Sequence, residues 1–133
     1  MSYTVKVYSK KREGNTKVSA NFKVKEFACK DGSNIVVISP ELVKLLQDIR
    51  THFGKAVTIT SGYRTVNYNS KVSGSSAESK HCKGLAADIK ISGVSPKTVA
   101  GYVETIMPDS GGIGIYSNFV HVDVRRDKAR WNG

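Results

Sequence analysis

The spacing of apolar residues predicts two amphipathic helices separated by strand-like segments. The first helix is expected to follow a cap at Ser39 and to stop at Gly54. The second is expected to open at Ser95-Pro96 and to end at Pro108. Their predicted buried faces are Leu42, Leu45, Leu46, Ile49 and Phe53 in the first helix, and Val99, Val103, Ile106 and Met107 in the second.

Shorter segments have the alternation or the apolar runs that are typical of β-strands. They cover residues 4–8, 56–60, 85–91, 111–116 and 119–124. The last two segments have the pattern of a hairpin, whereas the polar run at 10–17 and the small-residue tract at 74–76 are expected to be loops. This order of elements predicts a single α+β domain over residues 1–133, with a mostly antiparallel sheet and two main helices. A parallel βαβ fold is the alternative.

The composition suits one compact domain. The chain has 133 residues, of which 39% are apolar, and this is enough for one core. No segment approaches the roughly 20 apolar residues of a membrane-spanning helix, and residues 1–6 lack the apolar stretch of a signal peptide. We therefore expect a monomer that does not insert into a membrane and has no export route of its own.

The chain is strongly basic. Its 21 Lys and Arg residues against 11 Asp and Glu give a formal net charge of +10, which favours attraction to a polyanion. Nucleic acid and an acidic bacterial wall both qualify. The basic residues are scattered, as on an ordinary solvated surface, and by themselves identify no partner. Because no nucleic-acid-binding motif accompanies them, nucleic acid is not an expected partner.

The two cysteines, Cys29 and Cys82, lie far apart and form no C-x-x-C pair. A thiolate zinc site or a redox motif is therefore not expected. The pair is compatible with a disulfide or with two free thiols. Cys82 directly follows His81, so we expect it near the candidate site described next, in a structural role.

The three histidines lie in different contexts. His52 falls at the end of the first predicted helix, where a histidine is typically a surface residue favoured by the helix dipole. His81 precedes the predicted strand 85–91, which contains Asp88, and Gly84 would let the intervening loop bend His81 back towards that carboxylate. His121 occupies the predicted strand 119–124.

His81, Asp88 and His121 could therefore supply three N and O ligands to one metal. Three such ligands with a fourth position left to water are what a catalytic zinc site requires. Zinc in such a site lowers the pKa of water and polarises a substrate carbonyl. A histidine in a strand is more often a hydrogen-bonded core residue, so the spacing alone leaves both interpretations open.

Four motifs in order carry a resemblance to a known family. They are residues 26–32, the Ser-Gly-Tyr-Arg-Thr run at 61–65 with Asn69, residues 79–88, and residues 119–125. Together they resemble the D-alanyl-D-alanine carboxypeptidase and endopeptidase family of zinc peptidases, peptidase family M15, whose fold is shared by the hedgehog signalling domain. The similarity runs from 22 to 131 and leaves residues 1–21 as an N-terminal strand and loop arm.

The resemblance implies a zinc site. The family motif S-x-H-x-x-G-x-A-x-D fits residues 79–88 and carries the first two zinc ligands onto His81 and Asp88. The closing H-x-D motif carries the third ligand onto His121.

The resemblance also implies substrate-binding residues. The family arginine maps onto Arg64, where it would bind a substrate carboxylate or stabilise an oxyanion. A structural salt bridge is the alternative role. Tyr63 and Ser79, which stand in the same motifs, are expected to contribute to substrate binding.

The general base is the point at which the sequence departs from the family. Several members place a catalytic Glu or Asp three residues before the last histidine, and this position is Asn118 here. Asp123 is the first candidate because it shares a strand face with His121, and Glu78 is the second. Asp123 could instead orient His121 as a hydrogen-bond acceptor.

The sequence thus predicts a zinc metallopeptidase that hydrolyses peptide bonds in the stem or cross-link peptides of bacterial peptidoglycan, as a carboxypeptidase or an endopeptidase. A phage or prophage endolysin, made in the bacterial cytoplasm and acting on the wall after release, fits this prediction. Anionic cell-wall polymers are further expected partners. A zinc-containing wall-binding module without catalysis is the alternative, and a nucleic-acid binder is the third hypothesis.

Overall fold

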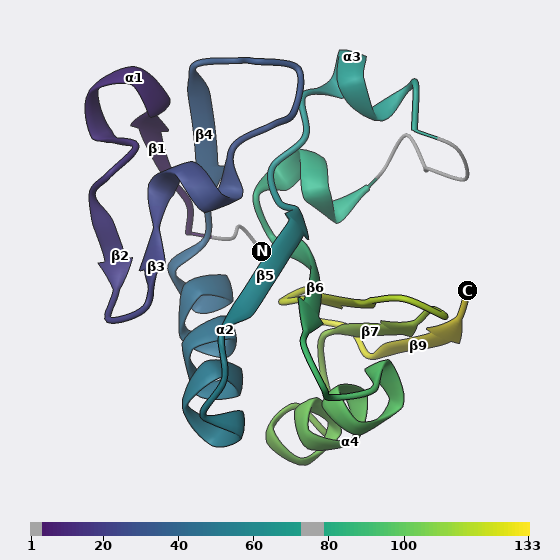
Figure 1. Cartoon of the computed structure of the whole chain (residues 1–133). Coiled ribbons are helices and arrows are strands. Elements are labelled where there is room, and N and C mark those ends of the chain that lie inside the picture. The colour runs from purple at the N-terminus through teal and green to yellow at the C-terminus, as the bar shows by residue number, and fades with distance from the viewer. Residues whose placement is uncertain (1–3, 73–78) are drawn as a thin grey trace.

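A five-stranded sheet forms the centre of the computed structural model, which describes residues 4–72 and 79–133 (Figure 1). Every neighbouring pair in this sheet is antiparallel except β7 and β9, which are parallel. The expected α+β class with a mostly antiparallel sheet is therefore confirmed. In spatial order the strands are β5 (Val57–Ser61), β6 (Ala86–Ile91), β8 (Val120–Asp123), β7 (Gly112–Ile115) and β9 (Ala129–Asn132).

The two longest helices are α2 (Pro40–Phe53) and α4 (Pro96–Ile106), as the apolar spacing predicts. The Ser39 side chain accepts a hydrogen bond from the N–H of Leu42 at the start of α2. Gly54 ends this helix in the left-handed conformation, with φ of 64°. Helix α4 begins in the same way, because the Ser95 side chain accepts from the N–H of Thr98.

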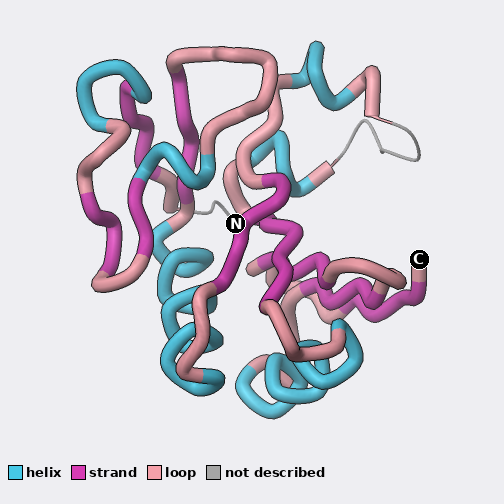
Figure 2. Tube along the Cα trace, viewed as in Figure 1, coloured by secondary structure: helices cyan, strands magenta, loops and turns pink. Residues whose placement is uncertain are grey.

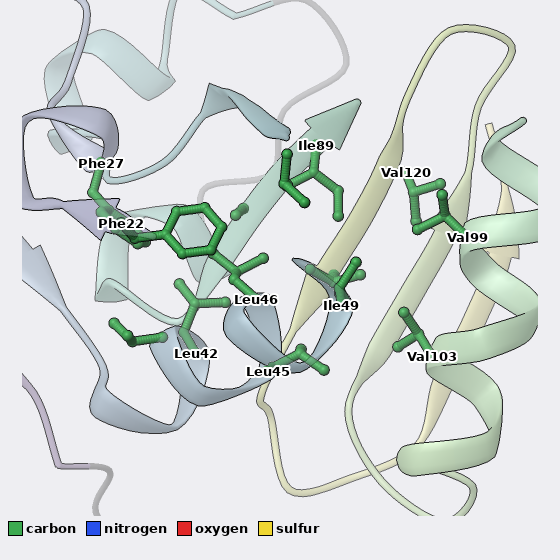
Figure 3. Close-up of a cluster of buried hydrophobic side chains, with 14 of the residues drawn as sticks. Phe22, Phe27, Leu42, Leu45, Leu46, Ile49, Ile89, Val99, Val103 and Val120 are labelled. Atoms are coloured by element: carbon green, nitrogen blue, oxygen red, sulfur yellow. The ribbon is translucent and has the colours of Figure 1, made fainter. Parts of the chain in front are cut away.

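The core lies between these helices and one face of the sheet. Figure 3 shows side chains of α2 and α4 directed towards Ile89 of β6 and Val120 of β8. Because side chains alternate along a strand, Asp88 and His121 point to the opposite face. The helices therefore cover one side of the sheet, and the polar residues of β6 and β8 occupy the other.

Two small two-stranded sheets lie on the side of the molecule opposite to β7 and β9 (Figure 2). Strand β1 (Lys6–Ser9) pairs with β4 (Ile35–Ile38), and β2 (Lys17–Ser19) pairs with β3 (Phe22–Lys23). The remaining short helices are α1 (Lys10–Glu13), η1 (Val24–Phe27), α3 (Val66–Asn69) and η2 (Lys80–Lys83).

Three details differ from the sequence prediction. The polar run at 10–17 is not a plain loop, because the Ser9 side chain caps one helical turn, α1. Ile106 is not buried but 40% exposed, since α4 ends at this residue. The sequence prediction also missed four strands, which are β2, β3, β4 and β9. The predicted loop at 74–76 lies outside the described residues.

The cysteines and the helix lengths complete the description. Both Cys29 and Cys82 are free thiols, the first buried and the second half-buried. Within the described ranges, no helix combines the length and the hydrophobicity that crossing a membrane would require.

Candidate metal centre

Asp88 and His121 lie directly opposite each other on neighbouring strands. The antiparallel register of β6 and β8 pairs these two residues, and it pairs Ala86 with Asp123. Nδ1 of His121 lies 3.0 Å from Oδ1 of Asp88. Both side chains are largely enclosed, since the exposed fraction is 7% for Asp88 and 8% for His121.

His81 reaches the same carboxylate from the turn that precedes β6. It sits in η2, where the Ser79 hydroxyl accepts a hydrogen bond from the His81 N–H. Gly84 then reverses the chain with φ of 73°, and a Cβ at this position would lie 2.6 Å from the carbonyl oxygen of Val37. Nε2 of His81 consequently lies 3.3 Å from Oδ1 of Asp88, as the sequence predicts.

Each of the two imidazoles has one nitrogen against an acceptor behind the ring and the other nitrogen turned towards Asp88. Nδ1 of His81 lies 2.8 Å from the carbonyl oxygen of Gly62, which can only accept, so Nδ1 carries the hydrogen. Nε2 of His121 lies 2.8 Å from Oδ2 of Asp123, which likewise accepts. These contacts leave Nε2 of His81 and Nδ1 of His121 facing Asp88. Each donates a hydrogen to that carboxylate when its ring is protonated, and each offers a lone pair to a metal ion when the nitrogen is deprotonated.

This donor set fits a divalent metal such as zinc. The ligand atoms of His81, Asp88 and His121 all lie within 4.8 Å of one another. Two neutral imidazoles and a carboxylate are typical zinc ligands, and metal-bound histidines usually donate their other N–H to a carbonyl or carboxylate. Gly62 and Asp123 supply these two acceptors. These three side chains could therefore hold a metal ion, with an acceptor behind each imidazole.

The electrostatics also favour a cation at this point. Burial would lower the pKa of His121, but hydrogen bonds to Asp123 and Asp88 outweigh it and raise that pKa. Burial would likewise raise the pKa of Asp88, but hydrogen bonds from His121 and His81 hold that pKa well below its usual range. The carboxylates thus favour a positive charge between them, which a metal ion would supply.

Asp123 is more deeply enclosed than the three ligands, with an exposed fraction of 0%. Its Oδ1 accepts from the N–H of Gly112 at 3.0 Å and from N and Nε of Arg125 at 3.1 and 2.8 Å. Its Oδ2 contacts Nε2 of His121 and accepts from Nη2 of Arg125 at 2.7 Å. With both oxygens occupied in this way, Asp123 is placed to orient His121. The geometry favours this role over that of a general base.

Glycines on β7 leave space for these side chains. Gly112 is paired with Asp123 and Gly114 with His121 in the sheet register. A Cβ on Gly112 would overlap the Asp123 carboxylate, with Cγ only 2.7 Å away, and one on Gly114 would lie 2.5 Å from the ring of Trp131. In β7 the glycines therefore leave space on the polar face, and the isoleucines that alternate with them pack against the core.

Arg64 is fixed beside the ligands. Its Nε donates to the Ser61 hydroxyl at 3.0 Å and its Nη1 donates to Oδ1 of Asn69 at 3.1 Å. Nη2 reaches Oδ2 of Asp88 at 3.4 Å, so the predicted salt bridge exists. These contacts use one N–H on each of three nitrogens, and a guanidinium has five N–H donors in all. Arg64 can therefore bind a further oxygen while it stays paired with Asp88.

The other predicted site residues have less defined roles. Tyr63 is half-buried against the core, and burial raises its pKa. Ser79 acts as the cap of η2, while Glu78 lies outside the described residues. Asn118 is exposed before β8 and lines a cavity with Val99 of α4, on the helix-covered side of the sheet.

Three residues to which the sequence prediction gave no role also contribute to the site. Asn69 is buried and holds Arg64, and Arg125 holds Asp123. Trp131 of β9 lies beside the site, with its ring centroid 5.0 Å from that of His121 and 5.4 Å from Cζ of Arg125. Asn69 and Arg125 stand within the recognised motifs, so their positions carried a signal. No local pattern in the sequence pointed to Trp131, because strand β9, which carries it, was not predicted.

Comparison with known proteins agrees with this geometry. The family model described as Peptidase M15 matches residues 20–123, which include all three candidate ligands and Arg64. The chain belongs to the peptidase M15 family. No solved structure matches the chain.

Two curated proteins illustrate the similarity of this M15 chain to other sequences. It is 33% identical over 95 residues to the probable peptidoglycan L,D-endopeptidase MepK of Haemophilus influenzae, which covers 65% of this chain and 50% of that protein. It is 32% identical over 99 residues to the peptidoglycan L,D-endopeptidase MepK of Escherichia coli K12, covering 68% and 53% respectively. The chain therefore spans about half the length of the curated relatives that it matches.

The metal site of this M15 chain can be tested by comparing two histidine variants. We expect the parent to bind one equivalent of Zn²⁺ in equilibrium dialysis, and His81→Ala to lose that binding because a buried ligand is removed. His52→Ala is the control, since His52 is exposed and stacks on Tyr102 away from the site. Equal zinc binding by parent and His81→Ala would contradict the assignment.

The space beside Asp123 can be tested with two glycine variants. We expect Gly112→Ala to lower the free energy of unfolding by about 1–3 kcal/mol, because the new methyl group overlaps a buried carboxylate. Gly101→Ala in α4, where a Cβ meets nothing within 4 Å, should raise it by up to about 1 kcal/mol. Urea unfolding measures both changes, and a neutral Gly112→Ala would show that Asp123 is not held tightly.

Proposed function

We propose that the chain is a zinc-dependent peptidase that hydrolyses peptide bonds in bacterial peptidoglycan. Membership of the M15 family and the cluster of His81, Asp88 and His121 support the metal-dependent chemistry. The peptidoglycan L,D-endopeptidase relatives support the substrate, and among the possible bond types they favour endopeptidase cleavage at an L,D bond. The single observation that carries the proposal is the pair of imidazole nitrogens, Nε2 of His81 and Nδ1 of His121, that face Oδ1 of Asp88, with a hydrogen-bond acceptor behind each ring.

The chain's own residues would hold and orient the reacting groups. His81, Asp88 and His121 would hold zinc, which when bound supplies a Lewis acid and a more acidic water molecule. Arg64, fixed by Ser61 and Asn69, would direct its remaining N–H groups towards a substrate carboxylate or the oxygen that becomes negative during attack on the carbonyl. Fixed donors of this kind lower the barrier because they need no rearrangement during the reaction.

Two carboxylate residues, Asp123 and Glu78, are the candidates for the general base. We propose that Asp123 positions His121, because both of its oxygens already accept hydrogen bonds from Gly112, Arg125 and His121. Glu78 is then the remaining candidate for the base named from the sequence.

The biological setting of the reaction, including release by a phage or prophage, is part of the same proposal and rests on the sequence.

Digestion of purified peptidoglycan tests the activity. We expect the zinc-loaded parent to release new amino termini and to give muropeptides cut at an L,D bond, as identified by mass spectrometry. His121→Ala and chelator-treated parent should lose at least about 100-fold in rate, because ligand and metal are both needed. Loss of terminal D-alanine alone would indicate a carboxypeptidase. Stoichiometric zinc without cleavage of several wall types would favour a wall-binding module.

The role of Asp123 can be separated from that of a base by titrating zinc. If Asp123 orients His121, Asp123→Asn should weaken zinc affinity by about 10- to 100-fold and regain most of its activity at saturating zinc. Glu78→Gln should keep its zinc affinity and lose activity if Glu78 is the base. Asp123→Asn that stays inactive with zinc fully bound would instead return Asp123 to the role of base.

A further inference from the structure

The positive charge of the chain is concentrated at its beginning. Residues 1–30 contain eight Lys and Arg against two Glu, a net +6, whereas the other 103 residues account for the remaining +4 of the total of +10. Most of this segment precedes residue 20, where the match to the family model begins. The arm itself, residues 1–21, carries five Lys and Arg against one Glu, a net +4, whereas the other 112 residues carry a net +6.

Backbone hydrogen bonds give this arm a defined shape. The N–H of Lys10 donates to the carbonyl of Asn34 at 2.7 Å, and the N–H of Lys25 donates to the carbonyl of Gly14 at 2.9 Å. The N–H of Val24 also donates to the carbonyl of Thr16 at 3.0 Å. Helix α1 and the following turn are thus fastened to η1 and to the loop before β4.

A cavity of about 540 Å³ lies at this junction. Four of its lining residues are cationic, three from α1 and one from η1, and the others, Gly14, Asn15 and Thr16, are neutral. In the described part of the chain, none of these cations forms an ion pair with an acidic side chain. The four are Lys10, Lys11, Arg12 and Lys25.

The two acidic residues of the segment do not neutralise the cavity. Oε1 of Glu13 accepts from the N–H of Ser9 at 2.9 Å, and Oε2 of Glu26 accepts from the N–H of Lys23 at 2.7 Å. Neither glutamate is among the residues that line the cavity. The cavity therefore presents four positive charges around a polar space, which suits an anion with several oxygens such as a phosphate group.

We propose that this arm pocket binds the phosphate groups of a phosphodiester-linked polymer of the bacterial wall. This inference rests on the proposed function, because it places the anionic polymer and the peptide substrate in the same wall. Nucleic acid fits less well, since no aromatic side chain lines the pocket to stack on a base. A helix of four residues, α1, is also too short to read a groove.

The arm pocket and the candidate metal centre lie on different parts of the molecule. Figure 1 shows α1 at one edge of the view, whereas β6, which carries Asp88, lies near its centre. A polymer held at α1 would leave the polar face of β6 and β8 open to a peptide. The pocket would then keep the enzyme on the wall between cleavage events and increase its local concentration near substrate.

Sedimentation with isolated walls tests the proposal. The triple variant Lys10→Gln, Lys11→Gln, Arg12→Gln should bind intact walls about tenfold or more weakly than the parent, with a shallower salt dependence. The matched control is Lys55→Gln, Lys90→Gln, Lys97→Gln, which removes the same charge from exposed positions outside the arm. The control should bind nearly as well as the parent. Thermal unfolding of both variants verifies that they are folded.

The probes distinguish the possible ligands. Walls stripped chemically of their phosphodiester polymers should lose the parent's binding, and inorganic polyphosphate should compete for intact walls. Equal losses by the two triple variants would attribute binding to overall charge and overturn the proposal. Unchanged binding of the parent to stripped walls would also overturn it. So would an arm triple variant that loses the parent's binding to DNA but still binds intact walls as the parent does. Sedimentation reports binding whether or not the wall is cut, so binding without cleavage would contradict only the proposed function.

Discussion

The antiparallel register between β6 and β8 is the constraint on which the candidate site depends. It sets Asp88 opposite His121 and, two residues along, Ala86 opposite Asp123, while the register of β7 with β8 places Gly112 on the other side of Asp123. A slip of one residue in either strand would move its polar side chains into the space occupied by the helices. The apolar side chains of Ile89 and Val120 oppose such a slip, because it would carry them out of the core. The stability of the core and the geometry of the metal centre therefore depend on the same pairing.

Charge balance around the site follows from this arrangement. Two carboxylates, Asp88 and Asp123, are enclosed within the same face, and each has an arginine in contact, Arg64 and Arg125. Without such partners a buried carboxylate is costly, so each arginine stabilises the folded chain as well as the site. The two arginines differ in how they contact these carboxylates. Arg125 uses Nε and Nη2 on Asp123, whereas Arg64 spreads its contacts over three residues and keeps only a long contact with Asp88.

Much of this could be predicted from the sequence because it depends on local periodicity. Alternation placed Asp88 and His121 on polar faces of two strands, and the caps and glycines marked α2 and α4. Strand β9 was not predictable, since its parallel pairing with β7 is accompanied by contacts of Arg130 with Glu104 and of Trp131 with Tyr116. These partners are distant in sequence and leave no local pattern. The enclosure of Asp123 was missed for the same reason, because one of its donors belongs to β7.

The loop between β5 and α3 connects His81, a candidate metal ligand, to Arg64. Its Gly62 carbonyl holds Nδ1 of His81, and two residues later the N–H of Arg64 donates to the backbone carbonyl of the same histidine. A Cβ on Gly62 would lie 2.8 Å from the backbone of Phe27, so the loop has little room to shift alone. Because the same loop backbone contacts both side chains, an anion bound at Arg64 and a metal bound at His81 would act on the same segment. By thermodynamic linkage, any factor by which the anion changes metal affinity is the factor by which the metal changes anion affinity.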